Sequence, residues 1–235
     1  MSTFTDSPEI TDRIGFRGDM RISASHATNV VTRRLVALDS IVVCKKRAGF
    51  RAEDVRAFSE VLEEALDEEP KFLIFDFAHR TGSAPVEFGV DGLPELVHAC
   101  ANLIANSNVV AIAWARGPMA GADLEFALSC SMIVAEAAAT FALSPYGSAY
   151  SFLARKIGVA RAERAMLNRD VLDSTAMRDM LLVRHVEETI NDDDAAIETF
   201  LRGNLRRHNA LAHMYRAQRL VMPVPYELVR AAHAA

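Results

Sequence analysis

A carboxylate follows a turn of small residues in the stretch "ARGPMAGADLEFALSC", residues 115–130. The apolar run before the turn predicts a buried strand, and the apolar pattern after Gly121 predicts a helix. The first N–H groups of such a helix have no intrahelical acceptor, so they are available to an anion beyond the end of the strand. Glu125 follows within about one turn, where it is placed to donate or accept a proton. The stretch therefore predicts an oxyanion-binding turn with its own acid or base.

The same spacing has a plainer interpretation. Strand-to-helix turns are common in α/β proteins, and Asp123 is a typical N-cap residue. On that interpretation Glu125 is an exposed helical side chain with no chemical role. The spacing by itself leaves both alternatives open.

The surrounding sequence predicts the elements that hold this turn. Residues 30–38 and 40–46 are β-branched segments that predict a hairpin or two adjacent strands, and residues 51–69 have the pattern of an amphipathic helix. Further strands are predicted at 71–77, 109–115, 132–136, 140–143 and 181–186, with helices at 93–105 and, as one long element, 195–222. Strands that alternate with helices predict an α/β domain with crossover connections.

Composition narrows the class of protein. The chain has 235 residues, of which 51% are hydrophobic, enough for a sizeable core. A formal net charge of -5 gives no electrostatic reason to expect nucleic acid, and no apolar run approaches the length that spans a membrane. Three widely spaced cysteines predict reduced thiols. We therefore expect a cytoplasmic protein that binds neither nucleic acid nor membrane.

The histidines do not predict a metal site. Seven are scattered along the chain without the spacing of a ligand set, so we expect no metal. His79 lies in the predicted loop 78–92 near the turn, and we expect a solvent-exposed ring. Trp114 ends the strand before the turn and is expected in the core, although the same place would suit the wall of an acyl pocket.

The stretch 115–143 resembles the signature region of the crotonase (enoyl-CoA hydratase/isomerase) superfamily. That signature is approximately "NGxAxGGGxExAxxCDxxxA" between two strands, and here Gly117, Gly121, Glu125 and Cys130 coincide with it. The similarity continues through "YSFLARKIGVARAERAMLNRDVLDSTAMRDMLLVRHVEE", so that it covers roughly residues 35–190. The phrases "ALSC", "IVAE" and "AYSF" are similar to the branch that makes diffusible-signal fatty acids from acyl-thioesters.

The resemblance implies a crotonase-like ββα spiral with a helical C-terminal region. It implies three parts: a flexible arm at 1–27, the core at 28–190 and helices for oligomerisation at 191–235. The implied ligand is an acyl-thioester of CoA or of an acyl-carrier protein, acting as substrate rather than cofactor. The implied assembly is a homotrimer or a dimer of trimers.

The resemblance also assigns roles to residues. Glu125 matches the first catalytic glutamate, and Ala122 matches the glycine whose N–H forms half of the oxyanion hole. In "EFGVDGL", residues 87–93, the N–H of Val90 is the implied second donor of the oxyanion hole. Gly121, Asp123 and Tyr146 are candidate supporting residues.

Three departures from the family pattern bear on activity. The glycine triplet is Gly121, Ala122 and Asp123, and side chains at the last two positions would be strained if those positions required a positive φ. No acid lies between Glu136 and Glu163, where the resemblance implies the second catalytic glutamate. The segment "VCKKRAGF", residues 43–50, lacks the family's Pro and Asn before the first long helix.

The basic residues of that last segment have two interpretations. Lys45, Lys46 and Arg47 are candidates for binding the phosphates of CoA, or they form a solvated basic edge.

Two functions follow as alternatives. The first is an acyl-thioester protein in which Glu125 alone supports isomerisation, hydrolysis or weak hydration. The second is an inactive crotonase-fold pseudoenzyme that serves as a scaffold or regulatory partner. Whether the chain is an enzyme is left open, as are the acyl group, the choice between CoA and carrier protein, and the pathway.

Overall fold

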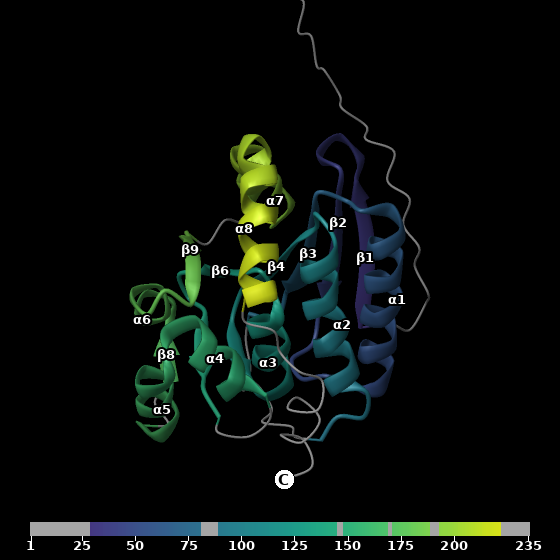
Figure 1. Ribbon diagram of the computed structural model, residues 1–235. Helices are drawn as coiled ribbons and strands as arrows, with labels where there is room; N and C mark the ends of the chain where they lie inside the picture. Colours follow the sequence, from purple (N-terminus) through teal and green to yellow (C-terminus); the bar gives the residue numbers. More distant parts are fainter. Residues whose placement is uncertain (1–28, 81–88, 145–147, 169–170, 189–192, 222–235) are drawn as a thin grey trace, which may run out of the picture.

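A computed structural model describes residues 29–80, 89–144, 148–168, 171–188 and 193–221. Its main sheet has six strands in the order β1-β2-β3-β4-β6-β9 (Figure 1). The strands are β1 Val30–Leu35, β2 Ser40–Lys45, β3 Phe72–Phe77, β4 Val110–Ala115, β6 Met132–Glu136 and β9 Val183–Glu187. The β1–β2 pair is the predicted antiparallel hairpin, and every other neighbouring pair in this sheet is parallel.

A second, three-stranded sheet was not predicted as a unit. It consists of β5 Pro118–Ala120, β7 Thr140–Ala142 and β8 Val171–Asp173, with β7 between the other two. Strand β5 is parallel to β7 and leads directly into the helix that carries Glu125. The small sheet therefore supports the turn before that helix.

The helices α1 Ala52–Glu68 and α2 Leu93–Asn106 confirm the predictions for these segments and pack side by side along the sheet (Figure 1). Helix α3, Gly121–Ser129, packs against α2. The helices α4 Ala149–Ile157, α5 Val159–Asn168 and α6 Ser174–Asp179 gather with β8 at the β9 end of the main sheet (Figure 1). Helix α8, His208–Val221, runs along α2 and also contacts β4.

The core lies where α1 and α3 meet the sheet. Every residue of β3 and β4 is buried, as expected for central parallel strands covered on both faces. Phe58 of α1, Phe75 of β3 and Phe126 of α3 meet with ring centroids 4.8 to 5.2 Å apart. Trp114 is fully buried, which confirms its expected place in the core. The helix that carries Glu125 is thus anchored by aromatic packing.

The predicted single helix at 195–222 is divided. Helix α7, Asp193–Asn204, is followed by a 3-10 turn, Leu205–Arg207, and then by α8. Gly203 and Asn204 stand at the division, and both are poor helix formers. The Asn204 side chain donates a hydrogen bond to the carbonyl of Phe200, which competes with the helical pattern at that point.

The proposed division into an arm, a core and an oligomerisation region stays a prediction, and residues 1–27 lie outside the described part of the chain. Among the helices that the structure describes, none combines the length and the hydropathy needed to cross a bilayer.

Candidate functional site

The turn between β5 and α3 has the backbone conformation that the sequence pattern indicates. Gly121 begins the helix with a φ of 51°, in the left-handed region where a glycine is favoured. Ala122 and Asp123 have no positive φ and lie in the first helical turn. The strain that we considered for these two positions is therefore absent, because the turn requires a glycine only at Gly121.

Asp123 does not have the capping role of the plainer interpretation. The N-cap residue of α3 is Ala120, and the carboxylate of Asp123 is fully buried beside the β2 end of the sheet. Its Oδ1 lies 3.0 Å from the Nζ of Lys45, and its Oδ2 accepts a hydrogen bond of 2.7 Å from the N–H of Gly49. This aspartate ties the helix to the strand and loop that precede α1.

The ion pair also decides between the two interpretations of the basic segment. Lys45 is fully buried, pairs with Asp123 and donates to the carbonyl of Arg47, so neither the phosphate-binding nor the solvated-edge prediction holds for it. Lys46 and Arg47 are exposed. A buried lysine with a carboxylate partner is a structural element here, because an unpaired ammonium at this depth would be strongly unfavourable.

His79 was predicted to be exposed, and this prediction is wrong: its side chain is buried behind β5. Its Nε2 donates a hydrogen bond of 2.9 Å to the carbonyl of Pro118 and lies 3.8 Å from Oδ2 of Asp123. Burial lowers the pKa of His79, and the Asp123 carboxylate partly opposes that shift. The ring joins the loop after β3 to the strand before α3.

Gly117 allows the same two segments to meet closely. A Cβ at this position would lie 2.4 Å from the carbonyl oxygen of His79 and 2.7 Å from the Cα of Arg80. Both are backbone atoms, so any larger residue would force the loop and β5 apart. The glycine matched by the resemblance therefore has a packing reason in this chain.

Glu125 is buried, which contradicts the interpretation of an exposed helical side chain. Its Oε1 accepts a hydrogen bond of 2.7 Å from the N–H of Ser148, and the hydroxyl of Ser148 donates to the same oxygen. Ser148 immediately precedes α4 as its N-cap. The carboxylate thus lies one turn after Ala122 and is held in orientation by the start of the next helix.

Ser148 was missed by the sequence analysis. The available signal was a serine directly before a helical pattern. It indicates an N-cap but does not reveal that the side chain of a distant glutamate accepts from the N–H and the hydroxyl of that serine. Val90 lies partly buried just before α2, where its carbonyl accepts from the N–H of Leu93. Tyr146, which was named as a candidate supporting residue, lies outside the described residues.

A buried ionic network fixes the strand ends below the site. Arg116 is almost fully buried, and it forms a double contact of 2.6 and 3.1 Å with Asp76 and one of 2.7 Å with Glu136. Arg80 also binds Glu136, at 2.8 Å. These residues join β3, β4 and β6 at their carboxyl ends, the edge where ligands of parallel sheets are bound.

The described residues contain no group of three or more His, Cys, Asp or Glu side chains arranged to hold a metal ion. Cys44, Cys100 and Cys130 are free thiols.

Solved structures of known proteins share this architecture. The model has a TM-score of 0.71 with a solved enoyl-CoA hydratase from Mycobacterium avium subsp. paratuberculosis, at 19% identity, covering 90% of this chain and 94% of that one. An enoyl-CoA hydratase from Geobacillus kaustophilus gives a TM-score of 0.67 at 16% identity, covering 89% and 87%. These likenesses confirm the predicted fold class.

Sequence similarity is more limited. A segment of 107 residues is 35% identical to mitochondrial methylglutaconyl-CoA hydratase from Rattus norvegicus and covers 43% of this chain. The human protein of the same name is 34% identical over the same length. The match spans about a third of each relative, at 34% and 32% of their length. No family model matches the chain. The chain thus has the fold of the enoyl-CoA hydratases, and a part of its sequence is similar to one of them.

Proposed function

We propose that this chain is a divergent member of the crotonase superfamily that binds an acyl-thioester at the β5–α3 turn. The observation that carries the proposal is the pairing of Gly121, in a left-handed conformation at the start of α3, with the buried carboxylate of Glu125 one turn later. The first N–H groups of a helix have no intrahelical acceptor, so this arrangement places candidate anion donors one turn before an oriented acid or base. The names of the similar proteins support a CoA thioester as the ligand.

In the proposed mechanism the N–H groups of Ala122 and Val90 hold the thioester oxygen. Glu125 removes a proton from the acyl chain, and the electron pair moves into an enolate whose negative oxygen these N–H groups stabilise. Return of the same proton to another carbon completes an isomerisation, with no net gain or loss of atoms. The hydrogen bonds from Ser148 hold the carboxylate of Glu125 in one orientation during both transfers.

One carboxylate limits the reactions. Hydration of an enoyl-thioester benefits from two groups that position and deprotonate a water, and residues 137–162 contain no acid. We therefore propose that the chain catalyses isomerisation or thioester hydrolysis in preference to hydration. A trimeric assembly, a cytoplasmic location and a relation to the diffusible-signal fatty acid branch are further parts of this proposal.

The second candidate is a pseudoenzyme that keeps the fold as a scaffold. Two observations favour it: Glu125 is occupied in holding the start of α4, and Asp123 replaces a small residue beside the turn with a buried ion pair. Both contacts stabilise the fold without any ligand.

The test is a calorimetric titration with free CoA and a panel of acyl-CoAs of different chain lengths. The same titrations are made with Glu125→Gln, which keeps the shape of the side chain, and with Glu60→Gln, which removes an exposed acid of α1 as a matched control. Turnover is followed by chromatography of the acyl-CoA and by release of free thiol.

We expect micromolar binding that depends on the acyl group, and a conversion rate that falls about a hundredfold or more in Glu125→Gln. Glu60→Gln should equal the wild type. Acyl-dependent binding without turnover would favour the pseudoenzyme. No binding of any member of the panel would overturn the thioester proposal and leave the fold unaffected.

A further inference from the structure

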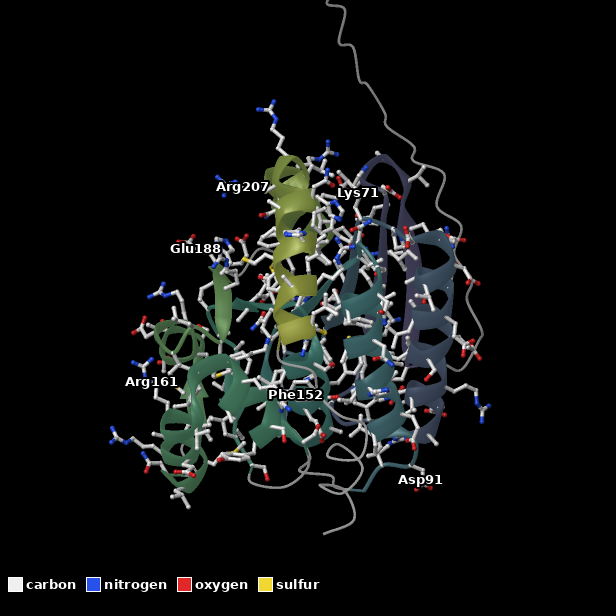
Figure 2. The ribbon with its side chains drawn as sticks, viewed as in Figure 1. Lys71, Asp91, Phe152, Arg161, Glu188 and Arg207 are labelled. Atoms are coloured by element: carbon white, nitrogen blue, oxygen red, sulfur yellow. The ribbon has the colours of Figure 1, made fainter. Side chains whose placement is uncertain are left out.

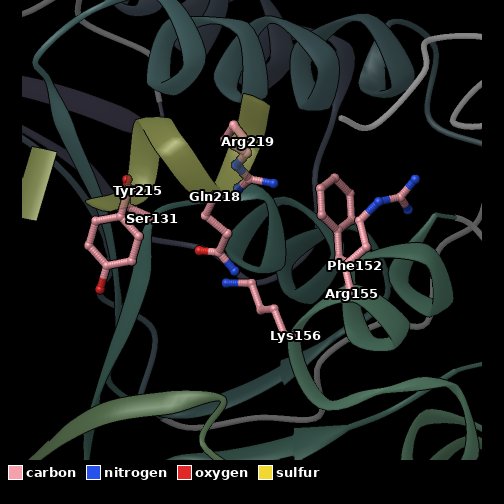
Figure 3. Close-up of a pocket in the computed structure, with 7 residues that line it drawn as sticks. All are labelled: Ser131, Phe152, Arg155, Lys156, Tyr215, Gln218 and Arg219. Atoms are coloured by element: carbon pink, nitrogen blue, oxygen red, sulfur yellow. The ribbon is translucent and has the colours of Figure 1, made fainter. Parts of the chain in front are cut away.

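A basic pocket lies at the opposite end of α3 from the proposed thioester site. It is formed where the C-terminal ends of α3 and α4 meet α8, and Figure 3 shows the side chains that line it. The lining residues are Ser131, Phe152, Arg155, Lys156, Tyr215, Gln218 and Arg219. The pocket is small and opens to solvent. In Figure 3 the amino group of Lys156 and the amide of Gln218 point toward one another, below the guanidinium of Arg219.

Both cations at the base of the pocket are held by backbone carbonyls. The Nζ of Lys156 donates to the carbonyl of Cys130 at 3.3 Å. Arg219 donates to the same carbonyl at 3.3 Å and to that of Ser129, and its guanidinium lies 5.7 Å from the ring centre of Phe152. These contacts fix the positions of two positive charges but use only part of their three and five donor hydrogens.

No carboxylate pairs with Lys156 or Arg219 in the part of the chain that the structure describes. The charged groups that act on Lys156 are Arg219 and the thiols of Cys100 and Cys130, and those that act on Arg219 are the same thiols and Arg155. Burial, with a smaller contribution from Arg219, lowers the pKa of Lys156 from 10.5 to about 8.

Capping of α3 does not account for the whole arrangement. Cations are favoured near the carbonyl end of a helix, whose partial charge is about -0.5. One side chain is sufficient for that purpose, whereas Lys156 and Arg219 bring two full charges to the same carbonyls. The second charge is more than capping needs, and both side chains are half-buried, so an anion from solution can reach them.

We propose that this pocket binds a phosphate-like dianion, either free phosphate or the phosphate group of a larger ligand. Two positive charges match a doubly charged tetrahedral anion, and lysine and arginine donors both suit phosphate oxygens. The amide of Gln218 adds a neutral donor at the mouth. The proposal does not rest on the thioester function.

The primary experiment is titration of the full chain with inorganic phosphate at constant ionic strength, followed by calorimetry and by phosphorus NMR. The variants are Lys156→Met and Arg219→Gln. Lys156→Arg keeps the charge, and Arg161→Gln removes a cation that projects from α5 at the edge of the molecule (Figure 2). Far-UV circular dichroism establishes that each variant keeps the fold.

We expect Lys156→Met and Arg219→Gln to weaken phosphate binding at least about tenfold, since each removes a charge-assisted contact. Lys156→Arg should retain most of the affinity, and Arg161→Gln should change it less than about twofold. Absence of phosphate binding to the wild type, or equal binding by wild type and Lys156→Met, would overturn the proposal.

A second measurement, the pH dependence of sulfate affinity, tests whether the charge of Lys156 contributes to anion binding. Sulfate remains a dianion across neutral and alkaline pH, so its affinity reports on the protein alone. The groups around the amine are Cys100 of α2, Cys130 after α3, Arg155 of α4, and Tyr215 and Arg219 of α8. Sulfate affinity should be constant below pH 8 and fall as Lys156 loses its proton above it. An affinity that is equal at neutral and alkaline pH would contradict the proposal.

The source of the anion is distinguished by comparing phosphate with adenosine monophosphate. Binding of the nucleotide that is tighter than that of phosphate, and that is lost in Lys156→Met, indicates the phosphate group of a larger ligand. Equal or weaker nucleotide binding indicates the free ion.

Discussion

Two lysines inside this protein differ in what surrounds their charge. Lys45 lies at the end of β2 with its ammonium against the buried carboxylate of Asp123. Lys156 lies at the end of α4, where it contacts a carbonyl and the guanidinium of Arg219 but no acid among the described residues. The first charge is balanced within the fold, and the second is not. A cation that lies wholly or partly inside the fold is therefore evidence for an external anion only where no carboxylate of the chain pairs with it.

The largest effect is expected where the balanced pair is broken. Lys45→Met leaves the carboxylate of Asp123 buried without its cation and should lower the free energy of unfolding by about 3–5 kcal/mol. Urea denaturation measures the change. Lys46→Met, on the exposed neighbour, is the control. Recovery of much of the loss in the double variant Lys45→Met/Asp123→Leu would show that the charge, and not the packing, is responsible.

A smaller effect is expected at the carboxylate of Glu125. Ser148→Ala removes the hydroxyl donor to its Oε1 and should cost about 1.5–3 kcal/mol, the range for hydrogen bonds to charged groups. Ser151→Ala, on the same helix, should change little. Chemical denaturation compares the two variants. Equal stability of Ser148→Ala and wild type would show that the hydroxyl does not hold Glu125 in solution.

Replacing Lys156 should raise the stability of the fold, whereas replacing Lys45 should lower it. The pKa of Lys156 is lower in the folded chain, so between about pH 8 and 10.5 the unfolded chain binds more protons and stability rises with pH. Below pH 8 the folded chain must keep a disfavoured charge. Lys156→Met removes it and should stabilise the protein at pH 7 by about 1 kcal/mol, after allowance for partial exposure and the lost hydrogen bond.

The stabilisation should decrease as the pH rises from 8 toward 10.5, because the folded wild-type amine is then neutral and no longer carries the disfavoured charge. Denaturation curves of the two proteins at pH 7 and pH 10 measure this difference. They are recorded without phosphate or sulfate, since an anion in the pocket would favour the charged lysine. A Lys156→Met protein that is less stable than wild type at pH 7 would show that the amine has an acid partner.

The smallest effect is expected for an exposed charge cluster. Arg34 of β1 contacts Glu64 and Glu68 of α1 at the surface. Arg34→Gln should lower stability by less than about 1 kcal/mol, and high salt should remove the difference. Thermal unfolding at low and high salt tests this. A loss as large as that of Lys45→Met would remove the distinction between exposed and buried pairs.

Much of the fold follows from local pattern. The hairpin of β1 and β2, the apolar strands β3 and β4 and the amphipathic helix α1 all appear as periodicity in the sequence. The division between α7 and α8 was missed because apolar spacing continues across Gly203 and Asn204, where local hydrogen bonding decides the conformation. Short strands such as β5 and β8 have three residues each, too few for any period to be detected.

The candidate site was predictable only in part. Glu125 and Gly121 are marked by their place after an apolar run, but the partners of the buried charges come from distant parts of the chain. Asp123 meets Lys45, and Glu125 meets Ser148, through tertiary contacts that no spacing rule encodes. His79 was assigned to solvent because loop residues usually are exposed, whereas here β5 covers it.

The bond between Gly49 and Asp123 joins residues 74 positions apart. We expect a contact of such long range to form late in folding, because closing a long loop is unfavourable before the intervening β3, α2 and β4 are arranged. Until then the amine of Lys45 is open to water and to amine-reactive reagents, and afterwards it is enclosed. Pulse labelling of Lys45 during refolding would therefore report when α3 packs against the end of β2.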